Sequence, residues 1–133
     1  MQGWTERGRK VEPFTRFGGL FERATGNAPY DLPTRIAATE RRLDKRIVYN
    51  FTTNNDIIGG NSGSPVIAKD GSVIGAAFDG NIHSIGGSYG FDPRVNRTIV
   101  VSAAAVQEVL AKVYGGDALL RELGAGGGAR RRR

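Results

Sequence analysis

The amino-acid sequence predicts a mostly β fold with short helices at its edges, and three observations support this prediction. Glycine accounts for 20 of the 133 residues, and many glycines occur as adjacent pairs, which are typical of tight turns. Short runs of β-branched and aromatic residues lie between these turns. An Asp-Gly dipeptide separates two apolar runs within residues 66–78, which is a strong signal for a β-hairpin. A chain of this length is expected to form one domain or part of one.

Residues 1–45 are predicted to form an irregular and partly helical connecting segment. Three prolines interrupt it, and the apolar residues around Phe17 fit a short helical turn. Residues 34–43 fit a short polar helix in which Ile36 and Leu43 face inward. We assign no chemistry to this segment.

Residues 46–123 are predicted to form a sheet followed by terminal helices. The expected strands, in chain order, are residues 47–52, 66–68, 72–78 and 98–101, with a glycine-rich loop at 79–96. Ser102 is placed to cap a helix whose apolar residues recur at the helical period, and Gly115 is expected to end it. A further short helix is expected at 117–123, and residues 124–133 are expected to form a flexible Gly/Arg tail.

Composition excludes several classes of function. The sequence contains no cysteine and one histidine, which excludes disulfides, thiolate sites and any metal site that needs two histidines, so no metal ion or cofactor is expected. No apolar run approaches the ~20 residues of a membrane span, and no signal peptide follows Met1, so no membrane partner is expected. The net charge is +6, but four of the nineteen basic residues are the terminal arginines, which are typical of a solvated end; no nucleic-acid partner is expected.

The segment Gly-Gly-Asn-Ser-Gly-Ser-Pro at residues 59–65 is the candidate for chemistry. A serine hydroxyl is a poor nucleophile unless a base takes its proton and donors stabilise the oxyanion. The glycines beside Ser62 allow a tight turn in which the amides of Gly60 and Ser62 point at one spot, as an oxyanion hole requires. Glycine, asparagine and serine are also the commonest turn formers, so the same residues fit an ordinary turn.

The order of the elements after Ser62 resembles the C-terminal half-barrel of chymotrypsin-like serine peptidases. Residues 53–66, the sequence Phe-Asp-Gly-Asn at 78–81 and residues 91–98 are similar to the bacterial family that includes dipeptidyl-peptidases seven and eleven. The likeness extends from about residue 10 to residue 124. It implies a mostly β fold, namely the C-terminal half of a chymotrypsin-like double β-barrel with a terminal α-helix and peripheral short helices.

The resemblance also implies an activity and a set of site residues. Members of this family release dipeptides from the N-terminus of peptides by means of a Ser-His-Asp triad. Ser62 matches the nucleophile, and Gly60 matches the oxyanion hole. Asp79 matches an acid that binds the free α-amino group, although a turn-capping aspartate is the ordinary alternative. Gly80 matches the position that distinguishes the P1 preferences within the family. Members with glycine at this position prefer hydrophobic P1 residues, and members with arginine prefer acidic P1 residues.

The sequence departs from a complete enzyme of this kind. A triad requires a histidine and an acid, but His83 follows Ser62 and does not match the catalytic position, so it is expected to be an exposed loop histidine. The chain therefore resembles a C-terminal fragment that is inactive alone, with exposed apolar side chains that would face a missing N-terminal barrel and helical domain. The resemblance implies a periplasmic location for the full-length protein, and a homodimer is considered for that form. The alternative is a non-catalytic β-barrel module that binds peptide termini through Asp79.

Overall fold

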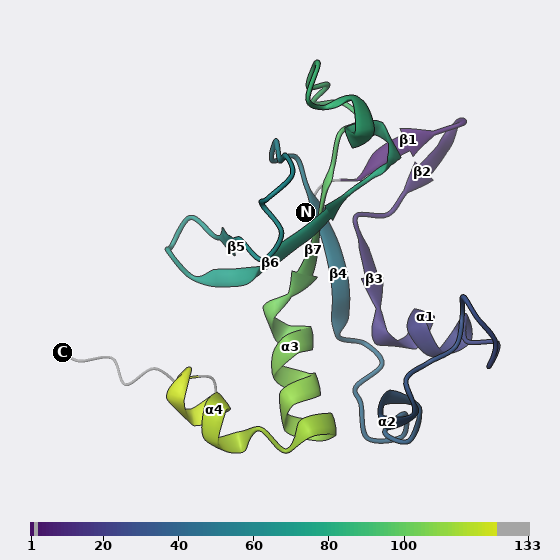
Figure 1. Ribbon diagram of the computed structural model, residues 1–133, viewed down its shortest axis with the longest axis vertical. Coiled ribbons are helices and arrows are strands. Elements are labelled where there is room, and N and C mark those ends of the chain that lie inside the picture. The colour runs from purple at the N-terminus through teal and green to yellow at the C-terminus, as the bar shows by residue number, and fades with distance from the viewer. Residues whose placement is uncertain (2, 125–133) are drawn as a thin grey trace.

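The central feature of the molecule is an antiparallel five-stranded sheet with the strand order β3–β4–β7–β6–β5 (Figure 1). The computed structural model describes residues 1 and 3–124. The strands of this sheet are β3 (Phe14–Arg16), β4 (Val48–Thr53), β5 (Pro65–Ile67), β6 (Val73–Gly80) and β7 (Thr98–Ser102). Within the described residues the sheet is open, with β3 and β5 as its edges.

The α-helices gather at one end of the sheet, and a small hairpin lies at the other. Figure 1 shows α3 leaving the end of β7, with α4 at its far end and α1 and α2 beside the end of β3. The helices are α1 (Phe17–Glu22), α2 (Thr34–Ala37), the 3-10 helix η1 (Ile82–Gly86), α3 (Ala103–Val109), the π-helix η2 (Leu110–Tyr114) and α4 (Asp117–Glu122). The separate hairpin pairs β1 (Trp4–Glu6) with β2 (Arg9–Val11).

The four strands and the hairpin predicted in the second part of the chain are confirmed within two residues at each end. The helix cap is confirmed as well, because Ser102 Oγ accepts a hydrogen bond from the Ala105 amide at 3.0 Å. The same hydroxyl donates to the carbonyl of Val48 and so ties the start of α3 to β4. Gly115 ends the helical run in the left-handed conformation, with φ = 64°. The last turn differs from the prediction in being a π-helix.

Residues 1–45, predicted to be irregular and partly helical, contain the helices α1 and α2 but also three strands that the prediction lacks. Arg7 and Gly8 both have positive φ, 47° and 73°, and form the tight turn between β1 and β2. The turn was missed because its strands are largely charged and show no alternation of apolar and polar residues. Pairing of β3 with β4 then makes this segment part of the main sheet.

Two further expectations were only partly correct. The predicted helix at 34–43 is limited to α2, and residues 38–43 form turns in which Leu43 is nonetheless buried. Thr39 Oγ1 lies 2.9 Å from the carbonyl of Ile36, a side-chain bond that competes with helix continuation. The predicted loop at 79–96 contains η1. The tail beyond residue 124 lies outside the described residues.

The core lies where α3 and the sheet meet. The apolar side chains with at most a twentieth of their surface exposed are Phe17, Leu43, Phe51, Ala77, Val100 and Ala105. Val100, on the central strand β7, is fully buried. Gly75 of β6 lies so close to β7 that an added Cβ would sit 2.4 Å from the Val101 carbonyl oxygen and 2.6 Å from Val100 Cγ1. The centre of the sheet therefore requires glycine at this position.

We expect Gly75→Ala to lower the free energy of unfolding by at least about 2 kcal/mol, because the new methyl group overlaps backbone that the sheet hydrogen bonds hold in place. Urea unfolding followed by circular dichroism measures this loss. Gly90→Ala is the control, since a Cβ at Gly90 would meet no atom within 4 Å. Equal stabilities of the two variants would contradict the close approach of β6 to β7.

The expected exposed apolar side chains are present, and several lie on the β5–β6 hairpin. Ile67, Val73 and Phe78 are 59%, 58% and 44% exposed. Further exposed isoleucines line the pocket beside Ser62, namely Ile58 in the preceding loop and Ile85 in η1. Among the described residues no helix is long and apolar enough to cross a membrane.

Candidate active site

Two glycines and an asparagine shape the turn that carries Ser62. Gly60 and Gly63 have φ of 97° and 89°, a region that favours glycine, so the backbone reverses direction on both sides of the serine. Asn61 Oδ1 accepts a hydrogen bond from the Ile58 amide at 2.8 Å, and the Asn61 amide donates to the Ile58 carbonyl at 3.2 Å. The Asn61 side chain therefore stabilises the turn by a hydrogen bond to a backbone amide of the same turn.

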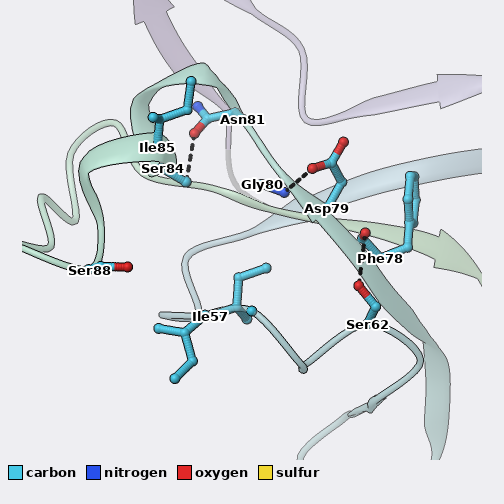
Figure 2. A pocket seen from close by; sticks show the side chains of 11 residues that line it. Ile57, Ser62, Phe78, Asp79, Gly80, Asn81, Ser84, Ile85 and Ser88 are labelled. Atoms are coloured by element: carbon cyan, nitrogen blue, oxygen red, sulfur yellow. Dashed lines mark hydrogen bonds between the residues drawn. The ribbon is translucent and has the colours of Figure 1, made fainter.

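The far side of the turn is fixed to strand β6. Gly63 donates its amide to the Ala77 carbonyl at 2.7 Å, and the Ala77 amide donates to the Ser64 carbonyl at 2.9 Å. Ser62 lies between this anchor and the Asn61 bond, and its Oγ donates to the Phe78 carbonyl at 3.3 Å (Figure 2). The serine is exposed. Its hydroxyl is thus held beside β6 and remains accessible.

The two amides expected to form an oxyanion hole are available in the structure. Among the described residues, neither the Gly60 amide nor the Ser62 amide donates a hydrogen bond. Both residues are exposed, so water or a ligand can reach them. A pair of unoccupied donors beside a serine hydroxyl is the arrangement that stabilises a tetrahedral oxyanion.

A β-bulge at Phe78 sets the direction of the residues that follow it. Ala77 pairs with Val100 and Asp79 pairs with Ile99, which leaves Phe78 as an extra residue on β6. Asp79 Oδ1 accepts a hydrogen bond from the Gly80 amide at 2.8 Å (Figure 2). Its second oxygen has no partner among the described residues, and the side chain is exposed. The carboxylate therefore has a free acceptor for a cation.

Ser62, Asp79 and Gly80 line one pocket of about 270 Å³. Figure 2 shows Ser84 and Ile85 on one side of this pocket and Ile57 and Ser62 on the other. The complete lining is Ile57, Ile58, Gly59, Ser62, Phe78, Asp79, Gly80, Asn81, Ser84, Ile85 and Ser88. Asp79 is the one charged residue among them, so the pocket is apolar on several sides and negative at one point. Gly60 contributes its backbone next to this lining.

A buried arginine, to which the sequence analysis assigned no role, supports the wall of the pocket. Arg97 is 2% exposed, and its guanidinium donates to the carbonyls of Gly3, Pro93, Arg94 and Asn96. Its own backbone amide donates to Asn81 Oδ1 at 3.1 Å. The arginine therefore joins the N-terminus, the loop before β7 and the start of η1.

An ion pair between Asp92 and Arg94 lies in the same loop. The pKa of Asp92 is held at about 2, below its ordinary value of 3.8, because Arg94 donates side-chain and backbone hydrogen bonds to its carboxylate. A lowered pKa in the folded state stabilises that state at pH values above the ordinary pKa. This contribution is lost as the pH falls from 3.8 through about 2.

The expectation that His83 is an exposed loop residue is wrong. His83 is half-buried in η1, and its Nε2 is covered without a hydrogen-bond partner. The reason is that residues 82–86 form a 3-10 helix that packs on β6, whereas the glycine-rich sequence indicated an open loop. The Ser62 hydroxyl bonds to the Phe78 carbonyl, so within the described residues no histidine accepts its proton.

We expect Asn61→Ala to loosen the positions of the Gly60 and Ser62 amides without unfolding the chain. The variant loses the acceptor for the Ile58 amide, so the amides of Gly60 and Ser62 are no longer fixed. Fluorophosphonate labelling of Ser62 is measured with this chain fused into a full-length relative that supplies a general base. The labelling rate should fall by roughly 10-fold, which corresponds to the free energy of about one hydrogen bond. Asn61→Asp keeps the acceptor and should restore most of the rate; equal rates in all three proteins would contradict this role.

Comparison with known proteins identifies the family. The family model of peptidase S46 matches residues 1–125. Dipeptidyl-peptidase 7 of Capnocytophaga gingivalis is 43% identical over 97 residues, which cover 66% of this chain and 14% of that protein. An Asp/Glu-specific dipeptidyl-peptidase of Shewanella putrefaciens is 28% identical, over 84% of this chain and 19% of that protein. This chain belongs to the peptidase S46 family, which contains dipeptidyl-peptidases.

The solved structures agree with the fold. The crystal structure of Porphyromonas endodontalis DPP11 in complex with the dipeptide Arg-Asp superposes with a TM-score of 0.84 at 23% identity. The match covers 92% of this chain and 19% of DPP11. The predicted fold class is confirmed, because the chain is mostly β with short helices and matches DPP11. The sheet formed by residues 3–124 is not closed into a barrel. The chain spans less than a fifth of the length of these relatives.

Proposed function

We propose that this chain is the nucleophile-bearing part of a serine-type dipeptidyl-peptidase. The observation that supports this most strongly is the Ser62 turn, in which an accessible hydroxyl lies beside two amides without hydrogen-bond partners in the described chain. Ser62 Oγ attacks the carbonyl of the scissile peptide bond, and the amides of Gly60 and Ser62 bind the resulting oxyanion. A general base takes the Oγ proton during the attack and gives it to the leaving amine, and water then hydrolyses the acyl-enzyme and restores the Ser62 hydroxyl.

The general base comes from outside residues 1–133 in this proposal. The hydroxyl donates to a backbone carbonyl, which cannot accept its proton in catalysis. The single histidine, His83, lies in η1 with its Nε2 covered. A histidine oriented by an acid must therefore approach Ser62 from another segment. Exposed apolar side chains around the site, such as Ile58 and Phe78, offer a surface for that segment.

Asp79 limits the substrate to peptides with a free N-terminus. An exopeptidase must bind an ammonium group and reject an internal amide, and a carboxylate does so by a charge-assisted hydrogen bond. The second carboxylate oxygen of Asp79 is available for this bond. It lies in the same pocket lining as Ser62, which supports an ammonium site near the scissile bond.

We further propose a hydrophobic P1 residue. Gly80 brings neither bulk nor charge to the pocket, and three isoleucines, Ile57, Ile58 and Ile85, contribute to its lining. An acidic P1 side chain would find no cation among the lining residues and would be repelled by Asp79. The same pocket should therefore favour leucine-like over aspartate-like side chains.

The test is a fusion in which this chain replaces the matching segment of C. gingivalis dipeptidyl-peptidase 7. We expect the fusion to release dipeptides from chromogenic substrates with a kcat/KM at least about 10-fold higher for hydrophobic than for acidic P1 residues. The isolated 133-residue chain should show no turnover. Preference for acidic P1 residues would reject the specificity. A folded fusion with no fluorophosphonate labelling at Ser62 would favour a non-catalytic module that binds peptide termini.

A further inference from the structure

Gly80 and Ser84 meet at a distance that leaves no room for a side chain at position 80. A Cβ built on Gly80 would lie 2.8 Å from Ser84 Cβ and 3.3 Å from Ser84 Oγ. Gly80 does not have the positive φ that would itself require glycine, so the contact with Ser84 is what excludes a side chain. Any residue larger than glycine can enter only if Ser84 moves or is smaller.

Buried partners hold Ser84 in this place. Its Oγ lies 2.9 Å from Asn81 Oδ1 and 3.2 Å from the Arg97 carbonyl oxygen, and it accepts the Arg97 amide at 3.2 Å. The Ser84 amide donates to the Asn81 carbonyl at 2.8 Å. Asn81 and Arg97 are 7% and 2% exposed, so solvent cannot replace these bonds. A shift of Ser84 would break its bonds to Asn81 and Arg97, which would still bond to each other through the Arg97 amide and Asn81 Oδ1.

Ser84 also sets the position of the pocket wall. It belongs to η1, and the next residue, Ile85, lines the pocket together with Ser84 and Gly80. Figure 2 shows the hydrogen bond from Ser84 to Asn81 behind this wall. The space beside Ser62 is therefore limited by η1 as well as by the residue at the end of β6.

We propose that Ser84 is a second specificity-determining residue, which acts jointly with Gly80 on the P1 side chain. This inference rests on the proposed function, because it takes the pocket beside Ser62 as the P1 site. Glycine at position 80 and serine at position 84 form one steric unit that excludes a basic side chain from position 80. A basic residue at position 80 would pair with an acidic P1 side chain. It fits only if residue 84 is smaller than serine or shifts away from position 80.

The first test measures the contact itself, by thermal unfolding of the 133-residue chain. We expect Gly80→Ala to lower the Tm by roughly 5 °C, because the new methyl group overlaps Ser84. In the Ser84→Gly background the same change should lower the Tm by less than about 2 °C, since contacting residues are not additive. Gly86→Ala is the matched control on η1, because a Cβ there would meet nothing within 4 Å.

The second test measures specificity in the fusion enzyme described above. Gly80→Arg alone should lower kcat/KM for hydrophobic P1 substrates without raising it for acidic ones. The double variant Gly80→Arg/Ser84→Gly should raise the acidic-to-hydrophobic ratio of kcat/KM at least about 10-fold above that of Gly80→Arg. Gly86→Ala, which lies on η1 outside the pocket lining and adds a Cβ that would meet nothing within 4 Å, should leave the ratio close to that of the parent.

The outcomes separate this inference from the proposed function. Additive Tm losses, or a Gly80→Arg variant that favours acidic substrates as strongly as the double variant, would overturn the role of Ser84 while Ser62 is still labelled. Absence of Ser62 labelling in the folded parent fusion would overturn the proposed function, and the specificity role with it. Coupled Tm losses together with the larger ratio in the double variant would establish the joint role.

Discussion

Ser62→Ala is expected to abolish dipeptide release by the fusion enzyme, with a loss in kcat on the order of 10⁶-fold. The hydroxyl is the atom that forms the acyl-enzyme, and water cannot replace it in a site built around one oxygen nucleophile. The turn should survive the substitution, since its bonds come from Asn61, Gly63 and Ser64. Initial rates with a chromogenic dipeptidyl substrate, together with fluorophosphonate labelling, measure the effect.

Ser64→Ala is the matched control for this result. Ser64 is exposed two residues away, and its hydrogen bonds to Asn61 and Ala77 are made by backbone atoms, which alanine keeps. This variant should retain turnover within about 3-fold, as expected for a surface substitution. If the Ser62→Ala fusion keeps more than a small fraction of its turnover, Ser62 is not the nucleophile and another residue must perform the attack.

Asp79→Asn is expected to lower kcat/KM for peptides with a free N-terminus by about 10- to 150-fold. Asparagine keeps the oxygen that accepts the Gly80 amide but loses the charge that attracts an ammonium, and a hydrogen bond to a charged group is worth roughly 1.5–3 kcal/mol. Substrates with an acetylated N-terminus lack the cation, so their low kcat/KM should not change. The discrimination between the two substrates should therefore fall.

Asp31→Asn provides the control for charge alone, because Asp31 is an exposed aspartate outside the pocket lining. It should leave both substrates unaffected. An equal loss for free and acetylated peptides in Asp79→Asn would indicate that the aspartate acts by shaping the end of β6, and the ammonium site would then have to be sought elsewhere.

Local sequence patterns were sufficient for the elements in which neighbouring residues interact. The Asp70-Gly71 dipeptide predicted the β5–β6 hairpin, and Ser102 predicted the start of α3, where its hydroxyl accepts the Ala105 amide. The glycines beside Ser62 predicted a tight turn, and Gly60 and Gly63 have the positive φ that such a turn uses. In each case the interacting atoms lie within a few residues of one another.

Tertiary structure alone determined the features that shape the pocket. The bulge at Phe78 depends on the register between β6 and β7, and the position of Ser84 depends on Arg97, thirteen residues later. Arg97 in turn reaches the carbonyl of Gly3, ninety-four residues earlier. These contacts satisfy buried polar groups whose partners are distant in sequence, so no local periodicity or turn signal reports them. The sequence by itself therefore determined which residue is the candidate nucleophile, whereas the folded chain decided the size, charge and walls of the space beside it.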